Sequence, residues 1–550
     1  MSDWIRRLAS RPDARLNTGR TPRRATAASP HAVVVGAGFG GLAAAIRLLV
    51  RGYRVTVVDR LDQPGGRARV TRVPGTGADG QPGTYTFDMG PTLITAPFLF
   101  DELWEIAGER RADHVEMVET SPFYRIRFDD GDVFNYTGDA EAMEAEIARF
   151  HPADVAGYRR FLAQSEKIFE TGFLELGHVP FGRAADMAKI VPSMVALESH
   201  RTVYGFVAKH IRDRRLRQVF SFHPLLVGGN PFSTTSIYAL IAFLERHWGV
   251  WYAMGGTGAL VAGLAALITR LGGTLRLGET VSEITAKKVD GQSRATGVRL
   301  ATGEHLAADL VVSNADAAWT YRHLVAPEHR AHWTDARLDR TKLSMSLFVW
   351  YFGTDRRYED VAHHTILLGP RYRGLLDDIF EKHRLADDFS LYLHRPTATD
   401  PTMAPAGHDT FYVLSPVPHL DSGDTWSEYQ TEQYRRAVEA YLERTVLPGL
   451  PEHVTASLAL TPRSFFEDYL SLKGAAFSIQ PQLTQSAFFR PHNASEDVAG
   501  LFLVGAGTHP GAGMPGVLSS ARVLDTVVPD PDRLHEAFPL FSPERPRVPA

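Results

Sequence analysis

The strongest chemical signal in the sequence is a glycine-rich turn near the amino terminus. Gly36, Gly38 and Gly41 follow an apolar run and open a second apolar stretch at the spacing G-x-G-x-x-G. Such glycines allow a tight turn, close approach of a pyrophosphate and close helix packing, and the helix that follows offers unpaired amide groups to the phosphates. A strand predicted at 54–59 ends in Asp59, where a carboxylate can accept hydrogen bonds from ribose hydroxyls. The pattern predicts a dinucleotide site but does not separate FAD from NAD.

Composition narrows the redox chemistry that this site could support. The 550 residues include 59 Lys and Arg against 63 Asp and Glu, and no cysteine. Without thiols there is no disulfide, cysteine-ligated zinc or iron–sulfur cluster, so redox chemistry needs an organic cofactor or a metal held by His and carboxylates. The formal charge of −4 gives no whole-chain attraction for nucleic acid, which is not expected as a partner. No second fingerprint of the same form is found in mid-chain, so a relay between two nucleotides is not predicted.

Three histidines, His223, His363 and His364, could be read as metal ligands because imidazole suits several metals. No H-E-x-x-H or comparable carboxylate spacing accompanies them. We therefore expect hydrogen-bonded structural histidines and no metal site.

Two kinds of region, one of alternating strands and helices and one mainly helical, are predicted to position these residues. Apolar strands alternate with amphipathic helices near both ends of the chain, whereas residues 151–247 are predicted to be mainly helical. Glycines interrupt the uncharged stretch 248–269, so we expect a buried helix over 257–271 and a strand over 274–277 rather than a membrane span. Residues 1–30 and 529–550 have compositions typical of flexible tails, with an organelle transit segment as the less favoured interpretation of the first.

A basic amphipathic pattern marks residues 200–217. The basic residues are His200, Arg201, Lys209, His210, Arg212, Arg214, Arg215 and Arg217, and they alternate with Val203, Phe206, Val207, Ile211 and Leu216. Helices of this kind often lie on anionic membranes. A solvated face of an ordinary domain helix is an equally weighted alternative.

Several further segments resemble the carotenoid desaturase family within the flavin amine oxidase superfamily, and in particular bacterial-type phytoene desaturases. The resemblance covers roughly residues 31–528 and rests on the following segments: 64–68 (PGGRA), 87–91 (FDMGP), 255–256 (GG), 281–284 (VSEI), 220–252, 362–365, 388–394, 483–492 and 501–521. The chain departs from the family pattern at a looped insert over 74–83 and at Asp59, where the family commonly has Glu. Ala506 stands where amine oxidases usually carry an acid, which counts against the amine branch.

The resemblance implies a single FAD and an α/β fold (α+β overall), with a Rossmann-like FAD-binding domain interleaved with a mixed-sheet substrate domain. It places the FAD-binding domain at 31–110, 254–318 and 496–528, the substrate domain at 111–150 and 319–495, and a helical membrane-facing lid at 151–253. By resemblance, Gly66 and Arg67 lie near the pyrophosphate and Val281 near the adenine. Pro91, Gly507 and Met514 lie by the flavin ring.

The substrate implied by the resemblance is phytoene, a long hydrocarbon that needs an apolar tunnel excluding water. The aromatic residues between Phe220 and Tyr252 suit such a wall as a group, although for each one taken separately ordinary core is the favoured interpretation. The implied reaction moves a hydride to the flavin and a proton to a base or water, and Asp186 and Glu245 are candidate bases by residue type. Molecular oxygen or a membrane quinone is the expected oxidant of the reduced flavin.

A substrate that lives in lipid needs a route from the bilayer, so we expect a cytoplasmic protein attached to one membrane leaflet through 182–217, as a monomer or a homo-oligomer. Two alternatives stay open. One is a related flavoprotein acting on a later carotenoid or on an amine. The other is a non-catalytic isoprenoid escort of the same fold, which should carry no flavin.

Overall fold

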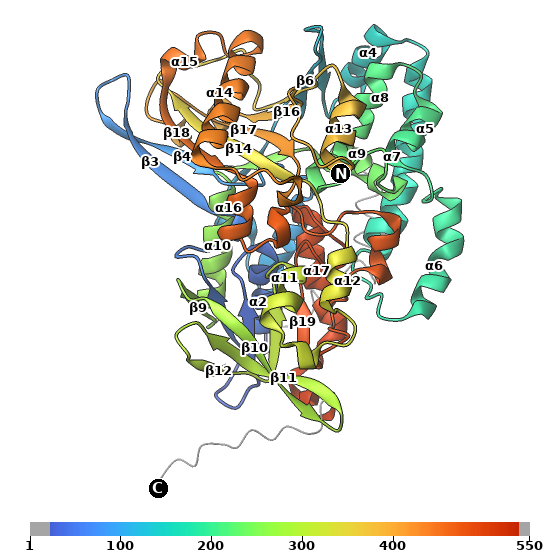
Figure 1. Ribbon diagram of the computed structural model, residues 1–550, viewed down its shortest axis with the longest axis vertical. Helices are drawn as coiled ribbons and strands as arrows, with labels where there is room; N and C mark the ends of the chain where they lie inside the picture. Colours follow the sequence, from blue (N-terminus) through green and yellow to red (C-terminus); the bar gives the residue numbers. More distant parts are fainter. Residues whose placement is uncertain (1–21, 538–550) are drawn as a thin grey trace.

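The computed structural model describes residues 22–537, which fold around two large β-sheets (Figure 1). The first sheet has five parallel strands in the order β19-β13-β1-β2-β9. They are β1 (His31–Val35), β2 (Arg54–Asp59), β9 (Thr274–Leu277), β13 (Leu310–Ser313) and β19 (Leu501–Leu503). Their carboxyl ends share one edge, so residues that directly follow the strands meet there although they are far apart in sequence.

Both faces of this sheet are covered, which explains its almost wholly apolar strands. Ala32 and Val34 of β1 face helices α2 (Phe39–Val50), α10 (Thr257–Arg270) and α17 (Met514–Val527). Val33 and Val35 face an antiparallel sheet of β10 (Val281–Val289), β11 (Gln292–Leu300) and β12 (His305–Ala307). The expected helix after residue 256 and the strand 274–277 are both confirmed.

The second sheet has seven strands in the order β18-β14-β17-β16-β15-β6-β7, and it is mixed because β15 pairs parallel with β6. Its strands are β6 (Tyr124–Arg127), β7 (Val133–Tyr136), β14 (Ser346–Thr354), β15 (His364–Leu367), β16 (Leu391–His394), β17 (Asp409–Val417) and β18 (Val454–Leu460). In β14, Phe348 and Trp350 pack in the cluster under α14 (Glu428–Thr445), while Leu347, Val349 and Tyr351 face the other way. The predicted combination of a Rossmann-like domain and a mixed-sheet domain is confirmed.

The segment 74–83, predicted as a looped insert, is a loop only over 77–81, because its two ends belong to the strands of a β-hairpin. Strands β3 (Val70–Thr76) and β4 (Pro82–Asp88) pair from Val70 with Asp88 to Thr76 with Pro82. The hairpin reaches the second sheet, where Phe87 contacts Tyr351 with ring centroids 6.1 Å apart. The hairpin lies beside the second sheet in Figure 1, and at its other end Asp88 accepts a hydrogen bond from the Thr257 amide of α10, which covers the first sheet.

Residues 151–253 are mainly helical, as predicted. They form α5 (Asp154–Phe169), α6 (Ala184–Ala196), α7 (Val203–His210), α8 (Arg214–Ser221) and α9 (Leu240–Trp248). Helix α6 lies at the outer edge of the molecule, and none of its residues is buried (Figure 1). Within residues 22–537, no helix has the length and apolar character needed to cross a membrane.

The flexible tail predicted from residue 529 does not begin there. Tyr53 donates a hydrogen bond to the Pro529 carbonyl at 2.7 Å, and Leu534 in α18 (Leu534–Ala537) is buried. These contacts fix the segment to the first sheet's helices. Residues 1–21 and 538–550, which belong to the predicted tails, lie outside the described residues.

Candidate active site

The turn between β1 and α2 has the geometry that a pyrophosphate requires. Gly36 has a φ of +97°, which only glycine adopts readily, and a Cβ at Gly41 would lie 1.9 Å from the Gly36 carbonyl oxygen. No side chain caps the amino terminus of α2, so its first amide groups remain available to an anion. Gly38 lines a large cavity at this point, as the sequence predicted for a pyrophosphate-binding turn.

Asp59 is held in place at the end of β2. Its Oδ2 accepts a hydrogen bond from the Ala37 amide at 2.6 Å, and its Oδ1 accepts one from the Leu61 amide at 2.8 Å. Burial raises the pKa of this carboxyl, while the two amide bonds oppose the rise. Asp59 lines the same cavity, as does Val281 at the start of β10. The ribose and adenine positions predicted from the sequence therefore lie together.

Arg67 is a partly buried cation facing this cavity. Its Nη2 donates to the Ser471 hydroxyl, its Nε has no hydrogen-bond partner, and no carboxylate among the described residues forms an ion pair with it. Burial lowers the pKa of the guanidinium, because desolvation disfavours its charged form. A bound anion would offset that cost. Gly66 precedes it with a φ of +55°. A guanidinium without an ion-pair partner beside a glycine turn fits a diphosphate.

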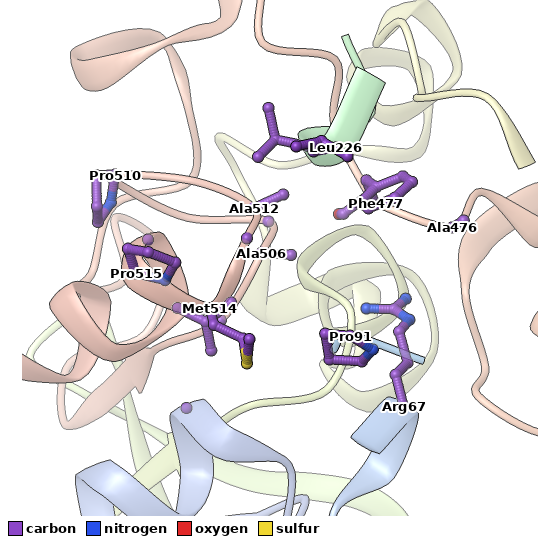
Figure 2. A pocket seen from close by; sticks show the side chains of 18 of the residues that line it. Arg67, Pro91, Leu226, Ala476, Phe477, Ala506, Pro510, Ala512, Met514 and Pro515 are labelled. Carbon is purple, nitrogen blue, oxygen red and sulfur yellow. The ribbon is translucent and has the colours of Figure 1, made fainter. Parts of the chain in front are cut away.

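The predicted flavin end of the cavity is built from two distant segments. Met514 and Ala512 come from the segment after β19, and Pro91 lies opposite them, beside Arg67 (Figure 2). Gly507 also lines the cavity, and a Cβ there would lie 2.6 Å from the Ala317 Cβ. On the side of the segment after β19, the wall includes the small residues Ala506, Gly507 and Ala512. The donor set and the shape both fit FAD.

One residue at the carboxyl edge of the first sheet was not predicted from the sequence as part of the site. Asn314 directly follows β13, and its side chain lies among the cofactor glycines, since a Cβ at Gly40 would be 2.4 Å from its Oδ1 and one at Gly505 would be 2.9 Å away. Asp316 lines the cavity two residues later. The available signal was an apolar strand, Leu310–Ser313, followed directly by polar residues, because the carboxyl ends of parallel strands carry binding residues.

The cavity continues from the flavin end into an apolar chamber, with a total volume of about 580 Å³. The chamber lies between the second sheet and the helical region 151–253. Its wall includes Leu347, Val349, Tyr412 and Leu414 from the sheet and Met187, Ile190, Met194, Leu225, Phe222 and Tyr238 from the helical region. The expected aromatic wall over 220–252 is mostly wrong, because of its aromatic residues only Phe222 and Tyr238 line the cavity. The others pack in the core.

The two candidate bases have different surroundings. Glu245 in α9 is fully buried and lines the cavity; its Oε1 accepts a hydrogen bond from the Tyr124 hydroxyl at 2.6 Å, and its Oε2 lies 3.1 Å from His223 Nε2. Burial, with Glu245 alongside, raises the pKa of Tyr124 well above its usual value, so its hydroxyl stays a donor. Asp186 in α6 is 30% exposed and lies 3.5 Å from Lys189. The structure does not bring Asp186 to the cavity wall.

Behind the sheet wall lies a buried group of three histidines, His363, His364 and His394. Burial lowers the pKa of each, that of His363 to about 3, so all three are neutral. His363 hydrogen bonds to Thr399 at 2.6 Å and to His394 at 3.1 Å, and His364 bonds to Tyr392 at 2.7 Å. The ring nitrogens spread over up to 4.8 Å, whereas two nitrogens on one zinc ion are at most about 4.2 Å apart. This geometry suits hydrogen-bonded histidines, as the sequence predicted, better than a preformed metal site.

The class of the protein follows from these features together with comparison to known families. The family model for flavin-containing amine oxidoreductases matches residues 39–523. Solved structures with the same fold include an oxidoreductase from Methanosarcina mazei, with a TM-score of 0.59 and 18% identity over 90% of this chain and 99% of that one. Putrescine oxidase is another, with a TM-score of 0.57 and 13% identity over 91% and 99% of the chains. The chain is an FAD-dependent oxidoreductase of this family.

Curated relatives show which branch of the family the chain belongs to. The neurosporene-forming phytoene desaturase of Rhodobacter capsulatus is 48% identical over 91% of this chain and 94% of its own length. The lycopene-forming phytoene desaturase of Pseudescherichia vulneris is also 48% identical, over 90% and 98%. All-trans-zeta-carotene desaturase of Myxococcus xanthus is 34% identical over 90% and 92%. Within the flavin-containing amine oxidoreductases, this chain belongs to the bacterial phytoene desaturase family.

Proposed function

We propose that the protein is a phytoene desaturase that dehydrogenates successive carbon–carbon single bonds of phytoene toward neurosporene or lycopene. The observation that carries this proposal is the apolar chamber, which opens directly onto the flavin end of the cofactor site. Among its wall residues from 151–253 and from the second sheet, Glu245 is the only charged one. A hydrocarbon fits such a chamber, and Tyr124 and His223 already bond to the two oxygens of its single carboxylate.

Each dehydrogenation removes a hydride from one carbon and a proton from its neighbour, leaving a double bond. FAD, when bound, supplies the two-electron acceptor for the hydride. The chain's own residues do the rest. The apolar wall aligns the polyene and keeps water out, and Glu245 faces the chamber as the acceptor of the proton. Tyr124 and His223 hold its two carboxylate oxygens in position.

The test is to mix purified protein with FAD and phytoene-loaded liposomes in air and to follow visible absorbance. Each new double bond lengthens the conjugated system, so bands should appear at longer wavelength, and their final position counts the desaturation steps. Colour from a later carotenoid or turnover of an amine, with none from phytoene, would contradict the proposal.

We also propose that oxygen or a membrane quinone reoxidises the flavin, because one dinucleotide fingerprint accounts for the glycine turns at the cofactor edge. Anaerobic assays with and without a quinone separate the two oxidants. A strict requirement for NAD(P)⁺ would contradict both.

Helix α6 is the element we propose for membrane attachment on the cytoplasmic side. Its inner face supplies Met187, Ile190 and Met194 to the chamber wall, and its outer face exposes Val191 at 49% and Val195 at 64%. A helix that is apolar on both faces at the edge of the chamber can touch lipid and substrate together. The basic helix α8 is less suited, because Leu216, Val219 and Phe220 are buried in the core and Arg215 pairs with Asp130 and Asp132.

A further inference from the structure

A buried arginine without a counter-ion lies directly behind the flavin segment. Arg490 is 1% exposed, and its guanidinium donates only to carbonyl oxygens: Nε to Gln485 at 2.9 Å, Nη2 to Ile479 at 2.5 Å, and Nη1 to Ala506 at 3.1 Å and Thr508 at 3.5 Å. No carboxylate within the described residues forms an ion pair with it. Carbonyl dipoles satisfy its hydrogen bonds but leave its full positive charge uncompensated.

This charge is separated from the cavity by one layer of backbone. Ala506 and Thr508, whose carbonyls it binds, flank Gly507 at the predicted ring position, and Ala506 points into the pocket (Figure 2). Further along the same segment, a Cβ at Gly511 would lie 2.6 Å from Arg490 Nη1. The guanidinium therefore packs against the back of the wall that faces the ring.

Neighbouring groups do not cancel the charge. The segment 505–516 contains one titratable residue, His509, and burial together with Arg490 lowers the pKa of His509 to about 4, so it is neutral near pH 7. Tyr238, the only other group with a direct electrostatic effect on Arg490, is a hydroxyl whose pKa burial raises. The segment 505–516 therefore carries no formal charge of its own at pH 7, and Arg490 is the cation bonded to its carbonyls.

We propose that Arg490 tunes the redox equilibrium of the bound flavin by stabilising the negative charge that the cofactor acquires on reduction. A hydride brings two electrons and one proton from the substrate carbon, so the flavin becomes more negative by one unit, while the second proton leaves to a base. A fixed cation in a dry wall favours that product. Arg67 lies on the opposite side of the cavity, beside Pro91, and is the cation expected at the phosphates (Figure 2).

The inference rests on the flavin site of the proposed function, but its test needs no phytoene. The two-electron midpoint potential of the bound flavin is measured anaerobically by dye equilibration in wild type and in three variants: Arg490→Met, Arg490→Gln and Arg490→Lys. Affinity for sulfite, which adds an anion to the oxidised flavin, is measured in parallel.

Both neutral variants should shift the equilibrium at least tenfold toward oxidised flavin, which is about 30 mV for a two-electron couple, and should bind sulfite correspondingly more weakly. Arg490→Lys keeps the charge and should stay near the wild-type potential although it loses most of the carbonyl bonds. Arg490→Gln removes the charge but keeps an amide group that can donate to those carbonyls. It therefore separates the effect of the charge from the effect of the hydrogen bonds that hold the segment 505–516.

A wild-type potential in the neutral variants would overturn the proposal, as would an equal shift in Arg490→Lys. Loss of FAD from both neutral variants would assign the residue to retention of the oxidised cofactor instead, which also contradicts it. A protein with the expected potentials but no phytoene turnover would overturn the proposed substrate and leave this inference standing.

Discussion

Glu245 and Asp186 show how one residue type acquires different chemistry from its surroundings. Both are acids in helices with apolar neighbours in sequence. Glu245 is enclosed, faces the chamber and has a partner on each oxygen, whereas Asp186 is partly exposed beside Lys189. A proton acceptor for a hydrocarbon must be within reach of carbon and shielded from water. Only Glu245 meets both conditions.

Replacing Glu245 with Gln should lower the rate of phytoene desaturation by about a hundredfold or more, the usual range for loss of general base catalysis. The amide keeps the shape and can still bond to Tyr124, so the flavin spectrum and liposome binding should be retained. Rates are measured in the absorbance assay. The matched control is Asp186→Asn, which should leave the rate unchanged; equal losses in both variants would contradict the assignment.

The cofactor residues were predictable and the surroundings of Glu245 were not, for a physical reason. Gly36, Gly38 and Gly41 act within one turn, so their spacing shows their role directly. Tyr124 is 121 residues from Glu245, and the two meet only because the second sheet packs on α9. Nothing local distinguished Glu245 from Asp186.

At the scale of elements, α6 is the helix that we propose for contact with lipid. A double substitution, Val191→Glu with Val195→Glu, places two charges on its exposed outer face and should abolish sedimentation with anionic liposomes. Desaturation of a short, detergent-solubilised polyene should persist, because the inner face is untouched. Neutralising the exposed Arg212 and Arg214 with Gln is the comparison, and a larger loss there than in the valine variant would assign attachment to α8.

The start of helix α10 makes stability depend on pH. Asp88 accepts hydrogen bonds from the Thr257 and Gly258 amides at 2.9 and 3.1 Å, and burial raises its pKa from 3.8 to about 6. The folded state therefore holds this proton more tightly than the unfolded state. The contribution of Asp88 to stability is complete below about pH 4 and is lost as pH rises through about 6.

The free energy of unfolding should fall by about 3 kcal/mol as Asp88 loses its proton, since one pKa unit corresponds to about 1.4 kcal/mol. Thermal melts of wild type and Asp88→Asn between pH 4 and 7.5 check it. The wild type should lose stability relative to the variant as pH rises. A pH-independent difference in stability caused by the Asn amide does not affect this comparison. Parallel pH profiles would show that Asp88 does not titrate in this range.

Elements with regular apolar patterns were predicted closely, as α10 and β9 show. The hairpin β3–β4 was not, because the Pro and Gly residues of 74–83 are typical of a loop. Pairing continues through Pro74 and Gly75, and Tyr85 and Pro405 pack so closely against Gly75 that a Cβ there would lie 2.7 Å from the Tyr85 ring. Tertiary packing overrode local propensity there.

At the scale of the whole molecule, the cofactor site brings together segments from the beginning, the middle and the end of the chain. Gly36 after β1, Asn314 after β13 and Gly505 after β19 lie within contact distance at one edge of the first sheet. The cavity then passes between that sheet and the second one. A ligand bound here touches segments from the whole length of the chain, so binding and global folding must be linked.

FAD should therefore raise the midpoint of thermal unfolding in proportion to the logarithm of its concentration. At a hundred times the dissociation constant the added stability is about 2.7 kcal/mol. The Gly38→Val variant should show no such rise, because a Cβ there already lies 3.0 Å from Asn314 Nδ2 and the remaining methyl groups would occupy the pyrophosphate space. Gly182→Val is the matched control, since a Cβ at Gly182 meets no atom within 4 Å. It should respond to FAD as the wild type does, and a full response in Gly38→Val would mean that the pyrophosphate binds elsewhere in the cavity.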